Sequence, residues 1–327
     1  MIYKLRLPRS RRKLGSLQFN LPITDKKSKD NLKLNGLGIF YGVSAYVIWG
    51  LLPVYWRWLE RASAFEILAN RGVWSLVVCL LFLAFQKQLR AALKLITNIK
   101  TFLTLALSSF LLTLNWGIYI WAVSLDRVVE SSLGYYMTPL VVVCFGVLIL
   151  KEKLNVAQKF SLTFAGIGVG VLTVAFGQIP LVAFGLAFSW GCYALVKKQM
   201  DANSLQTLSI EMLFALIPSL TYMFYLTSNG KAEFGIDLWF SLSLMSAGLL
   251  TVIPLLMFNS AATSLPLTIT GLLGYINPTI MFLVGFVLFD EPLTFTKIFG
   301  FIFIWVALIV LGINMYKSGR SAKQSKG

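Results

Sequence analysis

The sequence contains no histidine, only three cysteines and few charged residues. The lack of histidine excludes Ser-His proteases, His-ligated metal sites and haem ligation by histidine. Cys79, Cys144 and Cys192 lie in apolar runs without the spacing of metal ligands, so we expect three small buried hydrophobic residues. No nucleotide-binding loop or nucleophile–base pair appears either. The sequence therefore predicts no metal, no cofactor and no enzymatic activity.

Charge is scarce and apolar residues are abundant. Charged residues make up 13% of the chain and apolar residues 57%, against about 25% and about 45–50% in soluble proteins. The apolar residues form runs of about 20, and a helix of that length crosses the roughly 30 Å hydrocarbon core of a membrane. This pattern predicts an all-α polytopic membrane protein rather than two soluble domains.

Ten transmembrane helices are expected, joined by short links. Their expected ranges are 37–57, 67–85, 102–124, 131–150, 160–177, 180–196, 207–227, 238–259, 267–289 and 298–316.

The net charge of +16 lies mainly in two tails, residues 1–35 and 317–327. With the N-terminus inside, cytoplasmic pieces hold 23 Lys and Arg residues and outer loops hold 5. Because positive charge stays on the cytoplasmic side, both termini are predicted to be cytoplasmic, in a cell (plasma or inner) membrane. The first tail is expected to be disordered, and both tails to attract anionic lipid rather than nucleic acid. The alternative is an organellar transit peptide and an envelope membrane, because residues 1–35 are rich in Arg and poor in acidic residues.

A duplicated phrase indicates an internal repeat. LGYYMTP at residues 133–139 is echoed by LGYINP at 273–278, and each proline is followed thirteen residues later by a glutamate, Glu152 or Glu291. The two phrases fall on the fourth and ninth segments, which cross the membrane in opposite directions. The chain is therefore predicted to form two inverted five-helix repeats, residues 36–177 and 178–316. Inverted repeats are typical of secondary transporters, which bind substrate near the midplane between the halves.

The prolines of the phrase, Pro139 and Pro278, each remove a helical hydrogen bond and are predicted to kink their helices. Such a kink is either purely structural or also lines a cavity, where the freed carbonyl is satisfied. Tyr136 and Tyr275 stand one turn before the prolines. We expect them to line the cavity, and the alternative is that they anchor the helices at the membrane interface.

Two charges fall within apolar segments at equivalent places of the two halves, Arg71 and, 140 positions later, Glu211. Charged residues at membrane depth usually face the bundle interior or water. Because desolvation disfavours the charged form of a carboxylate, Glu211 is the candidate for proton coupling, and Arg71 the candidate for holding an anionic substrate group or balancing Glu211. The alternatives are that Arg71 snorkels to the surface and that Glu211 is an interfacial carboxylate near Lys197 and Lys198.

Asn115 and Trp116 place an amide beside a large aromatic ring at membrane depth, where the pair either joins helices or contacts a ligand. GxxxG spacings at residues 38–42 and 166–170 indicate close helix contacts within the chain or between two copies, so a homodimer stays an alternative without further support.

Two strings carry a family resemblance: YVIWGLLPVYWRWLERASAFEILANRGVWS at residues 46–75 and LNWGIYIWAVSLDRVVESSLGYYMTP at 114–139. With LTVIPLLMF at 250–258, they resemble RarD-type proteins of the EamA branch of the drug/metabolite transporter superfamily. The resemblance implies a cavity formed by the first four helices of each half, with helices 5 and 10 at the periphery.

The resemblance also implies roles for single positions. Residues of the usual type stand at Trp49, Glu66, Arg71, Asn115, Trp116, Glu130, Tyr136, Pro139 and Glu211. The second phrase departs from the family pattern, because Gly274 stands where a glutamine is expected and Asn277 where a small residue is expected. A side-chain amide is thus lost at position 274 and gained three residues later, and the substrate-binding or translocation residues predicted for this chain include Asn277 as well as Tyr275.

Together these features predict a secondary transporter of a small metabolite or drug-like solute, acting as an exporter. The soluble loops are too short for an ATPase, so transport would use an ion gradient or be facilitative. A membrane receptor or scaffold that transports nothing, a membrane-embedded enzyme and an aqueous channel are the alternatives.

Overall fold

The computed structural model describes residues 35–125, 127–288 and 295–324, and these residues form helices and no strands. Most of the predicted N-terminal tail and Glu291 lie outside the described residues. The helices are α1 (Gly36–Trp58), α2 (Ala64–Phe85), α3 (Leu89–Leu95), α4 (Ile99–Ser124), α5 (Val128–Leu148), α6 (Val156–Phe176), α7 (Leu181–Gln199), α8 (Ser204–Ser228), α9 (Leu238–Ser264), α10 (Leu267–Leu273), α11 (Ile276–Leu288) and α12 (Phe295–Gln324).

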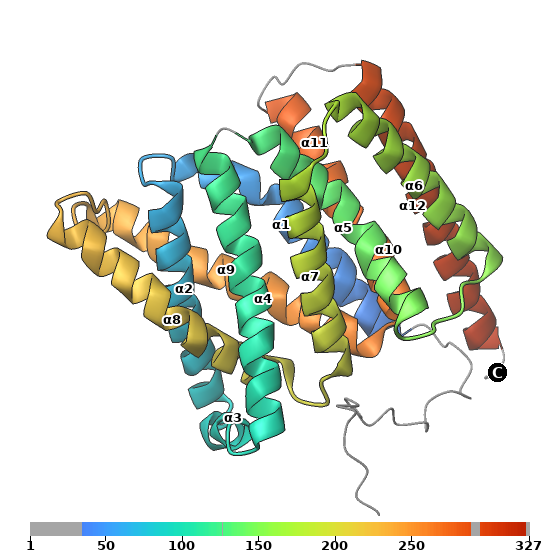
Figure 1. Ribbon diagram of the computed structural model, residues 1–327. Coiled ribbons are helices and arrows are strands. Elements are labelled where there is room, and N and C mark those ends of the chain that lie inside the picture. Colours follow the sequence, from blue (N-terminus) through green and yellow to red (C-terminus); the bar gives the residue numbers. More distant parts are fainter. Residues whose placement is uncertain (1–34, 126, 289–294, 325–327) are drawn as a thin grey trace, which may run out of the picture. The chain divides into compact units, whose positions relative to one another are not determined.

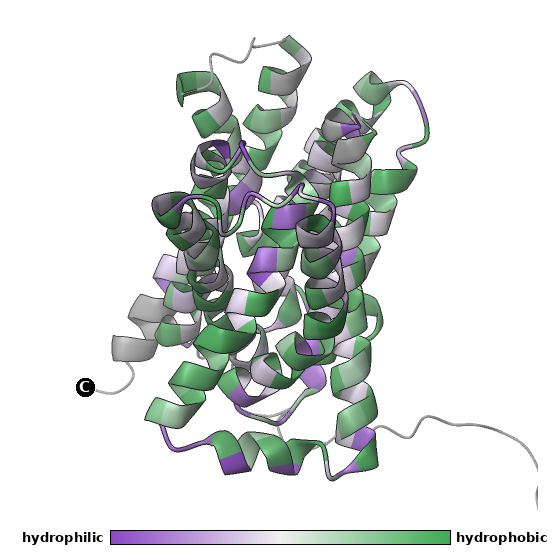
Figure 2. Cartoon of the chain, turned by 90° about the vertical axis from the view of Figure 1, so that its left-hand side faces the viewer, coloured by the Kyte–Doolittle hydropathy of each residue, from purple (hydrophilic) through white to green (hydrophobic). Residues whose placement is uncertain are grey.

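Ten helical spans of the described chain are long and apolar enough to cross a membrane, with α10 and α11 counted as one span. This confirms the predicted all-α fold with ten transmembrane helices. Figure 2 shows the helices coloured mainly as hydrophobic, with hydrophilic residues gathered toward their ends and in the connections.

Polar residues just before the helices explain where several of them begin. The side chains of Asn35, Ser63, Asn203 and Asp237 each accept a backbone N–H from the first turn of the helix that follows. At α6 the cap is reciprocal, because Asn155 and the residue three positions on bond to each other's backbone. Such caps satisfy N–H groups that would otherwise be unpaired.

The two halves pack through equivalent pairs of helices. Helix α1 of the first half packs against α9 and α11 of the second half, and α7 of the second half packs against α4 and α5 of the first half. The fifth span of each half, α6 and α12, pack on each other at one edge of the bundle (Figure 1). Exchange of partners between halves in this way is the arrangement expected of an inverted repeat.

The tripeptides IWG at residues 48–50 and SWG at residues 189–191 stand at equivalent places in the two halves, and the glycine of each allows a close helix contact. A Cβ atom added at Gly50 of α1 would lie 2.6 Å from the Cβ of Ile280 in α11, and one added at Gly191 of α7 would lie 2.8 Å from Val141 of α5. Glycine is therefore needed at both places, because it lets the backbones approach closely. The predicted GxxxG stretch at residues 38–42 also serves packing within the chain, since a Cβ added at Gly38 would lie 2.5 Å from Ser264 of α9 and one added at Gly42 would lie 3.1 Å from Leu273 of α10. In the stretch 166–170 only the middle glycine, Gly168, lies against another described helix, α12.

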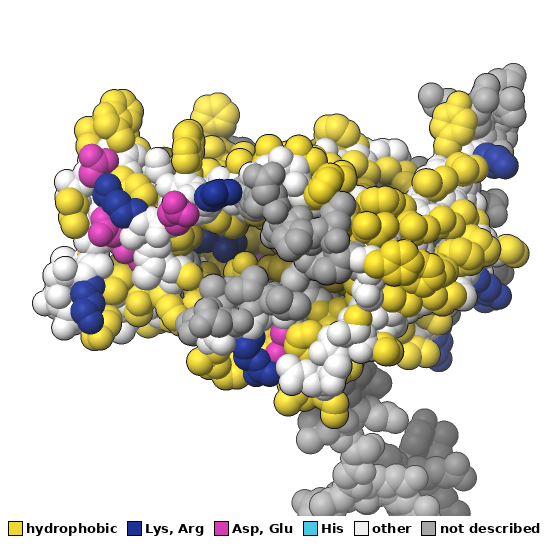
Figure 3. All heavy atoms as spheres, turned by 90° about the horizontal axis from the view of Figure 1, so that it is seen from above, with side chains coloured by type: hydrophobic (Ala, Val, Ile, Leu, Met, Phe, Trp, Pro, Cys, Tyr) yellow, Lys and Arg dark blue, Asp and Glu magenta, His cyan; other side chains and the backbone are white. Residues whose placement is uncertain are grey.

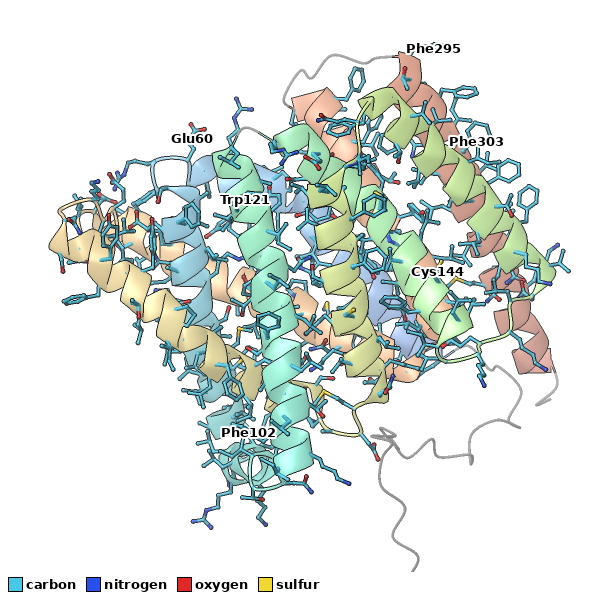
Figure 4. The ribbon with its side chains drawn as sticks, in the orientation of Figure 1. Glu60, Phe102, Trp121, Cys144, Phe295 and Phe303 are labelled. Carbon is cyan, nitrogen blue, oxygen red and sulfur yellow. The ribbon has the colours of Figure 1, made fainter. Side chains whose placement is uncertain are left out.

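Three details differ from the sequence prediction. The short helix α3 forms in a connection that has too few apolar residues to be noticed as a segment. The ninth span is interrupted after Leu273, and Pro278 follows in the first turn of α11, where its missing N–H is tolerated. By contrast α5 continues through Pro139. The expectation of three buried cysteines is confirmed for Cys79 only, because Cys192 is half-buried and Cys144 is exposed on α5 (Figure 4).

Candidate functional site

A cavity of about 150 Å³ lies between the two halves. It opens toward the end of the bundle that carries Glu60 and Trp121 in Figure 4, called here the cavity end, whereas Phe102 marks the opposite end. Figure 3 looks down on the cavity end and shows the hollow between the helices. Its described walls come from α1, α2, α4, α5, α7, α10 and α11, and no residue of α8 or α9 is among them.

The wall from α1 is one face of a helix. Tyr46, Trp49, Pro53 and Trp56 all line the cavity, and they follow one another at intervals of three or four residues. Side chains at this spacing lie above one another on a helix. Across the cavity the ring of Trp190 from α7 meets that of Trp49 edge to face, with centroids 5.2 Å apart.

The wall from α5 is formed in the same manner. Tyr135, Thr138, Pro139 and Val142 line the cavity at intervals of three, one and three residues, so they share one helix face. The Thr138 hydroxyl donates to the carbonyl of Gly134 (2.7 Å), so its own helix satisfies its donor.

Arg71 of α2 is the single charged residue among the described residues that line the cavity. Its Nε donates to the Thr251 hydroxyl of α9 (3.0 Å). The guanidinium carbon lies 5.0 Å from the ring centroid of Trp56 and 4.8 Å from that of Trp116, within the range of cation–π attraction. Among the described residues no carboxylate forms an ion pair with Arg71. The cation is therefore held in place, but its charge is not neutralised.

Asn115 of α4 presents a fixed polar group to the cavity. Its Nδ2 donates to the Leu186 carbonyl and to the Ser189 hydroxyl of α7, both at 2.9 Å. Since a carbonyl can only accept, these bonds fix which end of the amide is the nitrogen. The Oδ1 atom of Asn115 is left as an acceptor.

The two repeated phrases meet across the cavity floor. A Cβ added at Gly271 would lie 3.1 Å from the Pro139 carbonyl oxygen, and one added at Gly274 would lie 3.2 Å from the Pro139 ring. Glycine at both positions lets α10 and the turn after it approach α5. Asn277 follows this turn and lines the cavity, and its Oδ1 is buried with no hydrogen-bond partner among the described residues.

The structure divides the residues predicted to bind substrate into two groups. Arg71, Asn115, Trp116 and Asn277 line the cavity together, and so does Pro139. The others lie outside the described walls: Tyr136, Glu211, Tyr275 and Pro278.

The tyrosines predicted to face the cavity lie elsewhere, for reasons of helix geometry. Tyr136 packs edge to face on Phe301 of the peripheral helix α12, with centroids 5.3 Å apart. Its neighbour Tyr135 stands four residues before Pro139 and faces the cavity instead. Tyr275 stands in the turn between α10 and α11 and is fully buried in the hydrophobic core.

Glu211 lies in a second polar cluster toward the opposite end, called here the buried network: Ser108, Tyr193, Lys197, Thr207, Glu211 and Asn259. Lys197 Nζ lies 2.9 Å from Glu211 Oε1 and donates to the Thr207 hydroxyl (2.8 Å). Ser108 also donates to Oε1 (2.7 Å), and Tyr193 lies 3.3 Å from Oε2. Glu211 and Lys197 are 0% and 1% exposed. The structure therefore pairs Glu211 with Lys197 and not with Arg71.

Sequence reasoning missed part of each cluster. The aromatic stripe of α1 is visible in the sequence as Tyr46, Trp49 and Trp56 at helical spacing, and this signal could have predicted the cavity wall. For Glu211 the alternative of a carboxylate near Lys197 named the right neighbour, but it placed the pair at the membrane interface, whereas both side chains are buried.

The comparisons with known proteins agree with this arrangement. The sequence model of the EamA-like transporter family matches residues 36–174 and 178–313, one match for each half. Among similar proteins, "Protein RarD" of Escherichia coli (strain K12) is 34% identical over 88% of this chain and 97% of its own, and "Protein RarD" of Streptomyces exfoliatus is 36% identical over 88% and 91%. The "Uncharacterized transporter YojE" of Bacillus subtilis (strain 168) is 39% identical over 88% and 97%.

A solved crystal structure shares the fold, with a TM-score of 0.66 and 15% identity over 85% of this chain and 98% of the other. The matched halves, the ten apolar spans and the identities above 30% with RarD proteins lead to one conclusion. This chain is a multi-pass membrane protein of the EamA-like transporter family, related to RarD.

Proposed function

We propose that the protein is a secondary transporter that exports a small solute by alternating access. The observation that carries this proposal is the contrast between the two ends: a cavity with an uncompensated cation at one end and a closed polar cluster with a buried ion pair at the other. A solute site near the interface of two inverted repeats, exposed to one side at a time, is the general plan of such transporters.

We place both termini in the cytoplasm, because the Lys and Arg residues favour that side by 23 to 5. The cavity would then face outward, and the buried network would close the cytoplasmic side. Reporter fusions after Gly327 and in the 228–237 loop test this placement. The C-terminal fusion should report a cytoplasmic location and the loop fusion an outer one, and the reverse result would overturn the orientation.

For coupling we assign the proton-sensitive role to Glu211. The charged or titratable groups that face it are Lys197 and Tyr193 of α7 and Cys79 of α2. Protonation of Glu211 would cancel the charge that holds Lys197 and would weaken the closure between α7 and α8. The proton would thereby favour opening of the cytoplasmic side.

Reciprocal accessibility tests alternating access without knowledge of the solute. The native cysteines are replaced by serine, and a single cysteine is placed either at Thr138 in the cavity or at Thr207 in the buried network. Outside-out and inside-out vesicles are treated with a membrane-impermeant thiol reagent. Conditions that favour labelling of position 138 from outside should protect position 207 from inside, and the reverse.

Flux measurements complete the test. Proteoliposomes are screened for uptake of a metabolite library, and at least one solute should show saturable, protein-dependent flux. Independent labelling of both positions at once would indicate a channel. Fixed labelling with no saturable flux would indicate a receptor or scaffold and overturn the proposal.

A further inference from the structure

The cavity carries information about its solute, and the following inference rests on the proposed transport function. Arg71 is fixed through Nε by Thr251 and by the faces of Trp56 and Trp116. Its two terminal nitrogens have no hydrogen-bond partner given by the described residues. A guanidinium held by one edge in this way presents its remaining N–H groups as a fork, which matches the two oxygens of a carboxylate.

The charge of the walls restricts the solute further. Arg71 is the one charged residue among the described lining residues, and no carboxylate is among them. A cationic solute would be repelled at short range in a site partly shielded from water. Aromatic faces can attract cations, but Trp56 and Trp116 already face the guanidinium of Arg71. A dianion would bring a second charge without a partner. The walls therefore favour a single negative charge.

Size and wall chemistry define the rest of the solute. Cavities of about 150 Å³ accommodate a molecule the size of benzene, and this cavity has that volume. Its sides are aromatic, with Trp49, Trp190 and Tyr119 among the lining residues. A flat apolar ring is the body that such walls contact best.

A polar contact remains for a substituent on that ring. Asn115 Oδ1 is a fixed acceptor because Nδ2 is bound to Leu186 and Ser189. Asn277 offers a second amide, whose Oδ1 lacks a partner among the described residues. A hydroxyl on the solute can donate to such an acceptor.

We propose that the outer cavity binds small aromatic monocarboxylates, with the carboxylate on Arg71 and a ring hydroxyl on Asn115. Phosphate monoesters fit less well, because they carry nearly two negative charges at neutral pH.

Binding of radiolabelled benzoate to the purified full-length protein in nanodiscs tests the charge requirement directly. Competitors are matched in shape and differ in charge: benzamide, benzylamine and phenyl phosphate. We expect benzoate to bind saturably and each competitor to be at least about tenfold weaker, the loss that follows when one charge-assisted hydrogen bond is missing. Equal competition by benzamide, or stronger competition by benzylamine, would overturn the proposal. This series uses the unaltered chain, so it decides the question even if variants fold poorly.

Variants locate the carboxylate site. Arg71→Gln should weaken benzoate binding at least about tenfold, and Arg71→Lys should be intermediate because it keeps the charge and loses the fork. The matched control is Arg61→Gln, which removes an arginine that pairs with Glu233 outside the cavity, and its affinity should not change. If Arg71→Gln folds and keeps wild-type affinity, Arg71 is not the anion site.

The hydroxyl contact has its own readout. One of the three hydroxybenzoate isomers should bind more tightly than benzoate, and Asn115→Ala should remove this excess while leaving benzoate affinity within about twofold. If no isomer exceeds benzoate, or if the variant weakens both acids equally, the assignment of Asn115 is wrong. Saturable benzoate binding without transport of any solute would overturn the proposed transport function and leave the binding class standing, whereas transport of other solutes without benzoate binding would do the opposite.

Discussion

The cavity end and the buried network occupy equivalent places in the two repeats, yet only one of them neutralises its charge. Glu211 forms an ion pair, whereas Arg71 has no ion-pair partner among the described residues. Arg71 of α2 and Glu211 of α8 are counterparts, and each forms a hydrogen bond with a hydroxyl group of the opposite half. Arg71 donates to Thr251, and Glu211 accepts from Ser108. The difference lies in the residue that the preceding helix, α1 or α7, places against the charge. The counterpart of Trp56, which stacks on Arg71, is Lys197, which neutralises Glu211.

This difference shows how one duplicated backbone can serve two purposes. Where an aromatic ring faces the charge, the charge stays available and a cavity remains beside it. Where an opposite charge faces it, the pair closes the space between α7 and the start of α8, with both side chains buried. Four predictions can break or sharpen the comparison.

Removal of one member of the buried pair should have the largest effect. Lys197→Ala leaves Glu211 buried without its cation, which is expected to lower the free energy of unfolding by about 3 kcal/mol. The double variant Lys197→Met with Glu211→Leu should recover most of that loss, because hydrophobic residues often replace a buried pair without cost. Unfolding of the purified chain in detergent measures both.

Arg71→Met is the matched control at the cavity end. Because no described carboxylate depends on Arg71, its replacement should lower the free energy of unfolding by less than about 1 kcal/mol. If Arg71→Met and Lys197→Ala destabilise the protein equally, the two ends do not differ in charge pairing as described.

The second prediction concerns transport, with a solute identified by the uptake screen. Glu211→Gln keeps the shape of the side chain but cannot exchange a proton, so accumulation driven by a pH gradient should be lost while exchange of solute across the membrane continues. Uptake with and without a pH gradient, together with counterflow, measures the two activities. If the variant still concentrates solute with unchanged pH dependence, Glu211 is a structural residue.

The third prediction separates neighbouring tyrosines. Tyr135→Cys should react with a small water-soluble thiol reagent at least about tenfold faster than Tyr136→Cys, because Tyr135 faces the cavity and Tyr136 packs on Phe301. Labelling rates in a background without the native cysteines give the comparison. Faster labelling at position 136 would show that α5 presents another face to the cavity.

Most of the fold could be predicted from the sequence, because a membrane-spanning helix is recognised by its length and its apolar composition. All ten spans were predicted, and their ends differ by a few residues at which caps such as Asn203 decide the start. A kink at Pro278 was predicted, but not that the helix would break in the turn just before it, where Gly274 contacts Pro139. Contacts of this kind are set by packing between distant segments.

The site was readable only in part. Arg71, Asn115 and Trp116 were found because polar or bulky residues at membrane depth are few. Tyr136 was chosen over Tyr135 because it stands three residues before Pro139, as Tyr275 stands three residues before Pro278. About 100° of helix rotation separates the two neighbours, and it is Tyr135 that faces the cavity. The Glu211 partner could not be chosen between Arg71 and Lys197 from spacing, since the repeat symmetry suggested the first and short connections suggested the second.

The smallest effects are expected from the two hydroxyl groups that support the charges. Ser108→Ala removes a donor to Glu211 Oε1, which keeps Lys197 at 2.9 Å. Stability should fall by about 1–2 kcal/mol, because a buried charge loses one hydrogen bond. Thr251→Val removes the hydrogen bond that fixes Arg71 Nε. Stability should change by less than about 1 kcal/mol, but benzoate affinity should fall about threefold because the guanidinium is less well oriented for its ligand. Unfolding and binding measured on both variants give a crossed result, with Ser108→Ala affecting stability and Thr251→Val affecting affinity. If both variants change both quantities alike, the hydroxyl groups act only as helix contacts, and the distinction between a charge kept for a ligand and a charge consumed by closure would not hold.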